Sequence, residues 1–181
     1  MIKLIYNFIS KIYSLFFSFY EDIFLKKNLN FKSKPLIRFK NVILSNLNYE
    51  NYEKIYENKY LTKYIFPKDD INNIIEDLFI KNDLSQRISQ MTGLNYTVNF
   101  FTAYKTITIT DLDLDKPWYA NHYHIDKPYS KNMIKLFFSF ETVNFENGPM
   151  MIKDDKVYFG TLEKNEVLLF FANKYYHKAS S

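Results

Sequence analysis

Apolar residues recur at helical spacing along the first 25 residues, and polar residues form the opposite stripe. This pattern predicts one amphipathic helix over residues 2–25. Lys11 interrupts the apolar run, so a span of about 20 apolar residues across a membrane is not expected. Two interpretations stay open: the helix packs on the rest of the domain, or it lies in the surface of an anionic membrane beside the lysines that follow it.

Helical spacing continues as far as residue 94, after a short extended segment over residues 36–45. Three more helices are predicted: 47–60, 69–80 and about 83–91. Asp69 or Asp70 is the expected N-cap of the second of these, and Gly93 the expected end of the third.

From residue 95 the pattern alternates and is rich in Thr, Tyr, Phe and Val, which is typical of strands. The predicted strands are 95–110, 118–126, 133–144, 150–153, 156–159 and 166–172, with an edge near 174–178. Helices followed by short strands predict an α+β fold built round a β-sandwich or barrel. Residues 1–181 are expected to form one domain, mainly helical over 1–94 and β-rich over 95–181.

Composition narrows the function classes. The 181 residues suit one domain, and the absence of cysteine excludes disulfides, thiolate zinc sites and a cysteine nucleophile. Of the net charge of +4, the first 40 residues carry +6 and the remaining 141 carry −2. A basic groove across the β-rich part is therefore not expected, and nucleic acid is not an expected partner.

The three histidines all lie in the β-rich part of the chain. On a strand, His122, His124 and Asp126 would share one face because side chains alternate. His177 lies 51 residues after Asp126, behind the apolar strand 166–172. Two histidines and one carboxylate are the donor set of non-haem Fe(II) oxygenases. Histidines that are merely hydrogen-bonded within the fold are the alternative.

A longer pattern surrounds these residues. His124-Ile125-Asp126 leads into the strand Met133–Val143 and the turn Glu146-Asn147-Gly148-Pro149, and a later strand leads to His177 and small residues. Residues 95–181 thereby resemble the phytanoyl-CoA dioxygenase-like branch of the Fe(II)/2-oxoglutarate-dependent oxygenases. The resemblance implies a double-stranded β-helix (jelly roll) core with N-terminal helices.

The resemblance also implies chemistry. His124, Asp126 and His177 would be the metal ligands and catalytic residues, with Fe(II) as cofactor, 2-oxoglutarate as co-substrate and O₂ as oxidant. Asp126 stands where related halogenases have a small residue, which favours hydroxylation. The expected substrate is a small metabolite or a lipid- or sugar-linked intermediate. The expected location is cytoplasmic, with peripheral membrane contact through residues 1–27.

One part of the family pattern is missing. The family anchors 2-oxoglutarate with an arginine about ten residues past the distal histidine, whereas this sequence ends at Ser181. Its two arginines, Arg38 and Arg87, precede the motif and are not expected at the site. Lys135 and Lys105 are the candidates to substitute as a point charge, and a solvated lysine on a strand is the alternative for each.

Further residues near the motif are expected to contribute to the pocket. Tyr104 is expected either to contact the co-substrate or to be a core aromatic, and His122 either to line the pocket or to be ordinary packing. The aromatic residues expected beside it are Trp118, Tyr119 and Tyr123. A truncated oxygenase that lacks the last jelly-roll strand is the leading interpretation. The alternatives are a catalytically inactive jelly-roll binding protein and a membrane-associated accessory protein.

Overall fold

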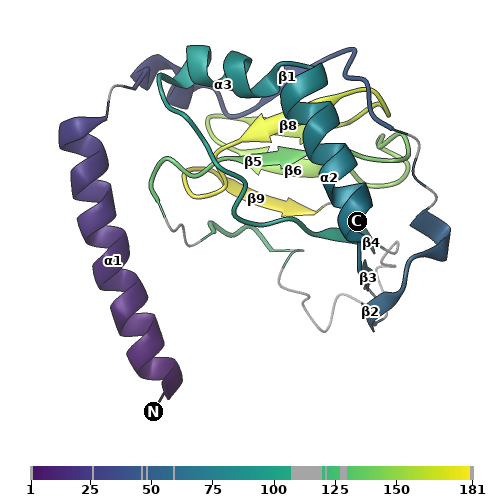
Figure 1. Ribbon diagram of the computed structural model, residues 1–181, viewed down its shortest axis with the longest axis horizontal. Helices are drawn as coiled ribbons and strands as arrows, with labels where there is room; N and C mark the ends of the chain where they lie inside the picture. The colour runs from purple at the N-terminus through teal and green to yellow at the C-terminus, as the bar shows by residue number, and fades with distance from the viewer. Residues whose placement is uncertain are drawn as a thin grey trace.

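Three α-helices and three antiparallel sheets make up the part of the chain that the computed structural model describes (Figure 1). The described residues are 2–25, 27–45, 47, 49–58, 60–106, 120, 122–126 and 130–179. The helices are α1 (Ile2–Phe24), α2 (Lys68–Glu76) and α3 (Leu84–Thr92). This arrangement confirms the predicted α+β class.

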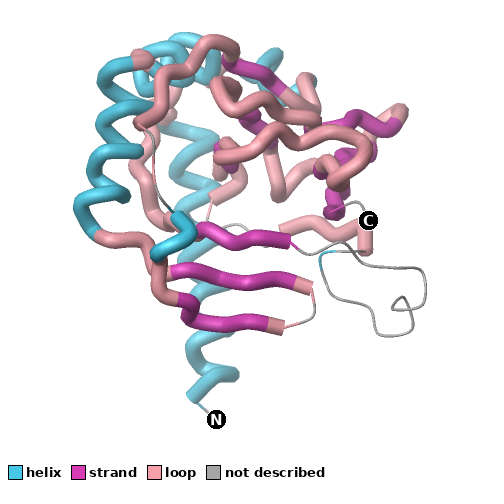
Figure 2. Tube along the Cα trace, turned by 90° about the vertical axis from the view of Figure 1, so that its right-hand side faces the viewer, coloured by secondary structure: helices cyan, strands magenta, loops and turns pink. Residues whose placement is uncertain are grey.

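Each sheet has three strands. The first has the order β1-β8-β5 (Ile37–Phe39, Val167–Phe170, Lys135–Phe137). The second has the order β7-β6-β9 (Val157–Gly160, Met150–Lys153, Tyr176–Ala179). The third has the order β2-β3-β4 (Lys54–Glu57, Leu61–Tyr64, Ala103–Thr106), and its strands lie side by side in Figure 2.

Strand β8 forms the centre of the hydrophobic core. All four of its residues are buried, as expected for a continuous apolar run covered on both faces. Phe170 of β8 belongs to the same buried cluster as Ile152 of β6, Ile74 of α2 and Ile88 of α3. The first two sheets and the two short helices therefore share one core.

Helices α2 and α3 confirm two of the predicted helices. A five-residue π-helical segment, Asp77–Lys81, follows α2, and α3 ends at Gly93, whose φ of 72° is accessible at low cost to glycine. The predicted cap of α2 is wrong, because Pro67 holds the N-cap position and Asp69 and Asp70 lie in the first turn. Asp70 instead accepts a hydrogen bond from Tyr52.

The helix predicted over residues 47–60 is wrong. Residues Tyr49–Asn51 form one 3₁₀ turn, and β2 follows, paired with β3. The side chain of Asn58 explains the change, because its Oδ1 accepts hydrogen bonds from the amides of Tyr60 and Leu61 and so fixes a hairpin turn. The tyrosines that suggested a helical stripe suit a paired strand equally well.

The other strand predictions hold in part. Strands β1, β6, β7, β8 and β9 lie at the expected places. Within the described parts of three other predicted strands, Ala103–Thr106 of 95–110 and Lys135–Phe137 of 133–144 are strands, and His124 of 118–126 forms an isolated bridge. Trp118 and Tyr119 lie outside the described residues.

Helix α1 projects away from the body of the protein (Figure 1). Packing of its apolar side on the domain, one of the two expectations, is contradicted, because its large apolar residues from Ile5 to Phe24 are exposed. The reason is that the body meets the polar edge of the helix, where Glu21 is buried. None of the described helices is long and apolar enough to cross a membrane.

A buried carboxylate ties the π-helical segment after α2 to the extended segment after β1. Asp77 accepts hydrogen bonds from Lys81 Nζ at 2.8 Å and from the Ser45 amide at 2.6 Å. Burial alone would raise the pKa of Asp77, but these two donors outweigh it and lower the pKa. The ionised form therefore stabilises the fold at neutral pH.

We expect Asp77→Asn to lower the free energy of unfolding at pH 7 by about 1.5–3 kcal/mol, the usual range for a hydrogen bond to a charged group. Because the folded pKa is depressed, this contribution is lost as pH falls through it. Urea unfolding of both proteins at neutral and acid pH checks this, and the difference should shrink in acid. A difference that is independent of pH would contradict the charge-based explanation.

Candidate metal centre

Two backbone hydrogen bonds bring the distant histidines together. The His124 amide donates to the His177 carbonyl at 3.1 Å, and the His177 amide donates back to the His124 carbonyl at 3.0 Å. The two residues are therefore direct partners across an antiparallel bridge beside β9, and their side chains lie on the same face. The Asp126 amide donates to the Ala172 carbonyl at 2.9 Å, which fixes the third residue.

Both imidazole rings are oriented by backbone carbonyls. His124 Nδ1 donates to the carbonyl of His122 at 2.8 Å, and His177 Nδ1 donates to that of Tyr175 at 3.2 Å. A carbonyl only accepts, so Nδ1 carries a proton in each ring. A neutral ring with its proton on Nδ1 carries its lone pair on Nε2, which is the atom that can bind a metal ion.

The Nε2 atoms of both rings lie near the carboxylate of Asp126. His124 Nε2 is 3.7 Å from Asp126 Oδ1, and His177 Nε2 is 3.7 Å from Asp126 Oδ2. One ligand atom from each of the three residues lies within 4.8 Å of the others. This confirms the predicted convergence, since ligands bonded at about 2.0–2.2 Å to one ion must approach each other this closely.

Burial keeps His177 in the form that a metal requires. Its ring lies edge-on to Phe170, with the ring centroids 5.1 Å apart. Burial lowers the pKa of His177 most, opposed by its hydrogen bond to the Tyr175 carbonyl, while His124 lowers it further. A neutral imidazole does not have to release a proton before it binds a metal ion.

The cluster can hold a metal ion. Its donor set is two imidazole nitrogens and a carboxylate on one side of a centre, which leaves the remaining coordination positions to other ligands. Closed structural zinc sites in contrast use four protein ligands, usually with thiolates. The geometry thus suits an ion that also binds small molecules.

Lys135, one of the expected anchors, lies at the cluster. It extends from β5, and its ammonium forms an ion pair with Asp126 Oδ2. The site therefore contains a cation next to its carboxylate. An anion that reached the cluster would meet this positive charge.

Strand β4 supplies the second expected contact. Burial raises the pKa of Tyr104, and the negative charge of Asp126 raises it further, so the phenol lies within electrostatic reach of the cluster. Lys105 is the next residue on the same strand and points to the other side. Tyr104 and Lys105 therefore lie on opposite faces of β4.

The arginines are engaged elsewhere, as expected. Arg38 forms an ion pair with Glu166, and Arg87 lies 4.7 Å from the ring centroid of Phe39. His122 is exposed and contributes its carbonyl, not its ring, to the cluster. The ring of Tyr123 contacts the ammonium groups of Lys153 and Lys178.

The carbonyls that orient the rings were not predicted from the sequence. Every residue carries a carbonyl, so no side-chain pattern marks those of His122 and Tyr175. A cavity of about 320 Å³ lies elsewhere, lined by residues such as Leu44, Phe140 and Lys164. None of the three cluster residues lines it.

Comparisons with protein-family models, curated proteins and solved structures found no match to this chain. No relative therefore lends it a function. The residues of the cluster, their geometry and the sequence motif around them are what bear on its activity.

Proposed function

We propose that the protein is an Fe(II)- and 2-oxoglutarate-dependent oxygenase, and specifically a hydroxylase. The convergence of His124, Asp126 and His177, with both Nε2 atoms directed toward one carboxylate, carries the proposal. Imidazole and carboxylate suit Fe(II), and three ligands leave positions for a chelating co-substrate and O₂. The motif around these residues supports the same choice of metal.

We also propose that the two sheets around the core belong to a jelly roll. The chain runs from His124, beside β9, to β5 in the first sheet, to β6 and β7 in the second, back to β8 and again to β9. Antiparallel strands that alternate between two sheets with a common core are typical of this architecture.

The chain's own residues would hold and orient the reactants. Fe(II) bound by His124, Asp126 and His177 would supply oxygen activation coupled to the conversion of 2-oxoglutarate to succinate and CO₂. Lys135 would neutralise a carboxylate of the co-substrate as a point charge, without the two-pronged contact of an arginine. Tyr104 would contact the co-substrate from β4. The substrate would be a small metabolite or a lipid- or sugar-linked intermediate.

A second candidate function has its own observation. Because Lys135 pairs with Asp126 and both arginines are engaged elsewhere, the cluster could serve a jelly-roll binding protein that does not turn over 2-oxoglutarate. Such a protein would bind a metal or an anionic ligand at the same residues. Co-substrate binding separates the two candidates.

Anaerobic Fe(II) titration of the full chain, with and without 2-oxoglutarate, tests the proposal. We expect the weak visible charge-transfer band of an Fe(II)–2-oxo acid chelate, and succinate formation once O₂ is admitted. Lys135→Gln should weaken 2-oxoglutarate binding about tenfold or more while Fe(II) still binds, because Asp126 keeps its charge. Lys105→Gln is the matched control and should behave as the unaltered chain.

The outcomes of the titration test the oxygenase, the alternative binding protein and the role of Lys135. Iron binding without a band in the unaltered chain would favour the binding protein over the oxygenase. No iron binding would refute the oxygenase. Equal loss of the band in Lys135→Gln and Lys105→Gln would mean that general charge, and not the position of Lys135, holds the co-substrate.

A further inference from the structure

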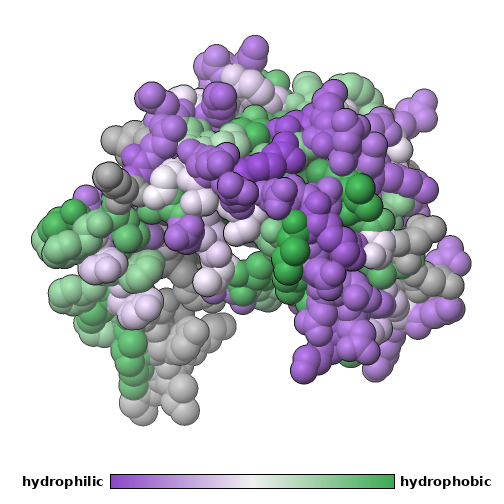
Figure 3. All heavy atoms as spheres, turned by 45° about the horizontal axis from the view of Figure 1, so that its top comes forward, coloured by the Kyte–Doolittle hydropathy of each residue, from purple (hydrophilic) through white to green (hydrophobic). Residues whose placement is uncertain are grey.

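Helix α1 is amphipathic, but its apolar face does not lie against the protein. Twelve large apolar side chains between residues 5 and 24 are exposed. At 3.6 residues per turn they occupy a face about 200° wide. The polar stripe is less accessible: Ser14 and Ser18 are partly buried, whereas Leu15 and Phe16 are 71% and 73% exposed. Figure 3 shows the helix as a hydrophobic projection beside the body.

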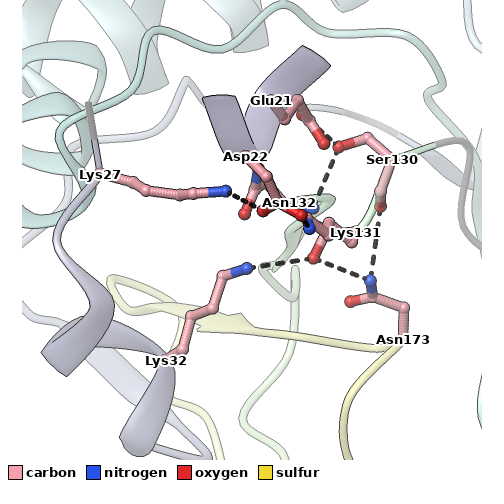
Figure 4. A network of polar contacts seen from close by, with 8 residues as sticks. All are labelled: Glu21, Asp22, Lys27, Lys32, Ser130, Lys131, Asn132 and Asn173. Atoms are coloured by element: carbon pink, nitrogen blue, oxygen red, sulfur yellow. Dashed lines mark hydrogen bonds and ion pairs between the residues drawn. The ribbon is translucent and has the colours of Figure 1, made fainter. Parts of the chain in front are cut away.

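Polar contacts at the last turn of α1 hold it in this orientation (Figure 4). Glu21 is 4% exposed and accepts a hydrogen bond from Ser130 at 2.5 Å. Asp22 forms ion pairs with Lys131 and with Lys27. Because these contacts use the polar edge, the helix is fixed to the body with its apolar face turned outward.

Positive charge surrounds this attachment. We define the α1 base as Glu21, Asp22, Lys27, Lys32, Lys131 and Lys174. It carries four lysines against two carboxylates, of which Glu21 is buried and Asp22 is shared by two lysines. The pKa of Lys32 is lowered by burial first and then by repulsion from Lys27, which Glu21 opposes and to which Lys174 adds. Lys34, which is exposed, follows in sequence.

We propose that α1 docks on the surface of an anionic lipid bilayer, with its apolar face in the interfacial region and the lysines of the α1 base at the headgroups. A wide apolar face fits a lipid interface better than a second helix, which needs only a narrow seam of two positions in seven. Lysines beside the helix complement anionic lipid headgroups. A length of about 34 Å lets the helix lie flat along the surface.

Co-sedimentation of the full chain with vesicles tests this. The vesicles are phosphatidylcholine alone or with about 30% phosphatidylserine. We expect binding to the anionic vesicles that weakens when salt is raised to about 0.5 M. The double variant Leu15→Gln with Phe16→Gln should partition at least about tenfold more weakly. Ser14→Gln with Ser18→Gln introduces the same two glutamine side chains on the polar stripe and should retain binding.

Two results would overturn the docking. One is equal binding of the two double variants. The other is a dimer in solution that only the Leu15/Phe16 variant dissociates, without vesicle binding, which would assign the face to a second copy of this chain. Leu15 and Phe16 do not belong to the cluster of His124, Asp126 and His177. The membrane docking and the proposed oxygenase activity are therefore tested independently.

Discussion

Replacing His124 with alanine is expected to weaken Fe(II) binding by well over about 100-fold. Loss of an outer-shell partner alone costs about 10–100-fold, and His124 would contribute a direct ligand. Its ring is partly exposed, so the variant should fold. Anaerobic titration followed by equilibrium dialysis measures the loss, and circular dichroism checks the fold.

The third histidine provides the matched control. His122→Ala removes an exposed imidazole two residues away but keeps the carbonyl that orients the ring of His124. Iron affinity should therefore stay within about twofold of the unaltered chain. If His122→Ala lost as much iron as His124→Ala, the assignment of the two histidines would be wrong. Asp126→Asn, which keeps the shape of the side chain, should resemble His124→Ala.

Replacing Phe171 with alanine is expected to lower the free energy of unfolding by about 3–5 kcal/mol. Phe171 is 1% exposed and packs edge-on against Phe31, with the ring centroids 5.0 Å apart. Its removal would leave a cavity at the end of β8 that the surrounding side chains cannot fill. Urea unfolding with a fitted midpoint and slope measures the loss.

Phe145 offers the control of the same type. It is 70% exposed and touches Phe159, so Phe145→Ala should cost no more than about 1 kcal/mol. Comparable losses in the two variants would mean that β8 is not the centre of the core. The Phe171 variant needs no metal or ligand for this test.

Local sequence patterns predicted the residues at the centre of the fold. Val167–Phe170 belongs to a continuous apolar run that lies between Glu166 and Asn173, and the shortness of this run favours a buried strand over a helix. Gly93 likewise marked the end of α3, because the required left-handed conformation is favourable for glycine. Where a structural position strongly favours one residue type, the sequence alone predicts that position.

Elements that depend on distant partners were harder to predict. Residues 47–60 have tyrosines at positions compatible with both helix and strand, and only the pairing of β2 with β3 decides between them. The outward orientation of α1 depends on Glu21 meeting Ser130, a contact 109 residues apart in the chain. Neither is visible in any short window of sequence.

The candidate site was predicted in its residues but not in its construction. Alternation placed His124 and Asp126 together, and the motif suggested His177. The direct pairing of His124 with His177 and the ion pair of Lys135 with Asp126 required the three-dimensional arrangement. Sequence spacing identifies donors, whereas ring orientation depends on which carbonyl lies beside each Nδ1.

The bridge between His124 and His177 couples metal binding by the candidate site to folding of the chain. It joins residues 53 positions apart in the chain, and His177 also pairs with Ile152 of β6, so the two rings meet only in the folded arrangement. An unfolded chain offers separate ligands that bind an ion weakly, and a metal ion would therefore favour the native state by mass action. At a concentration 100 times its Kd this linkage amounts to about 2.7 kcal/mol. A metal ion bound by the cluster would then stabilise the position of β9, in addition to the catalytic role proposed for the cluster.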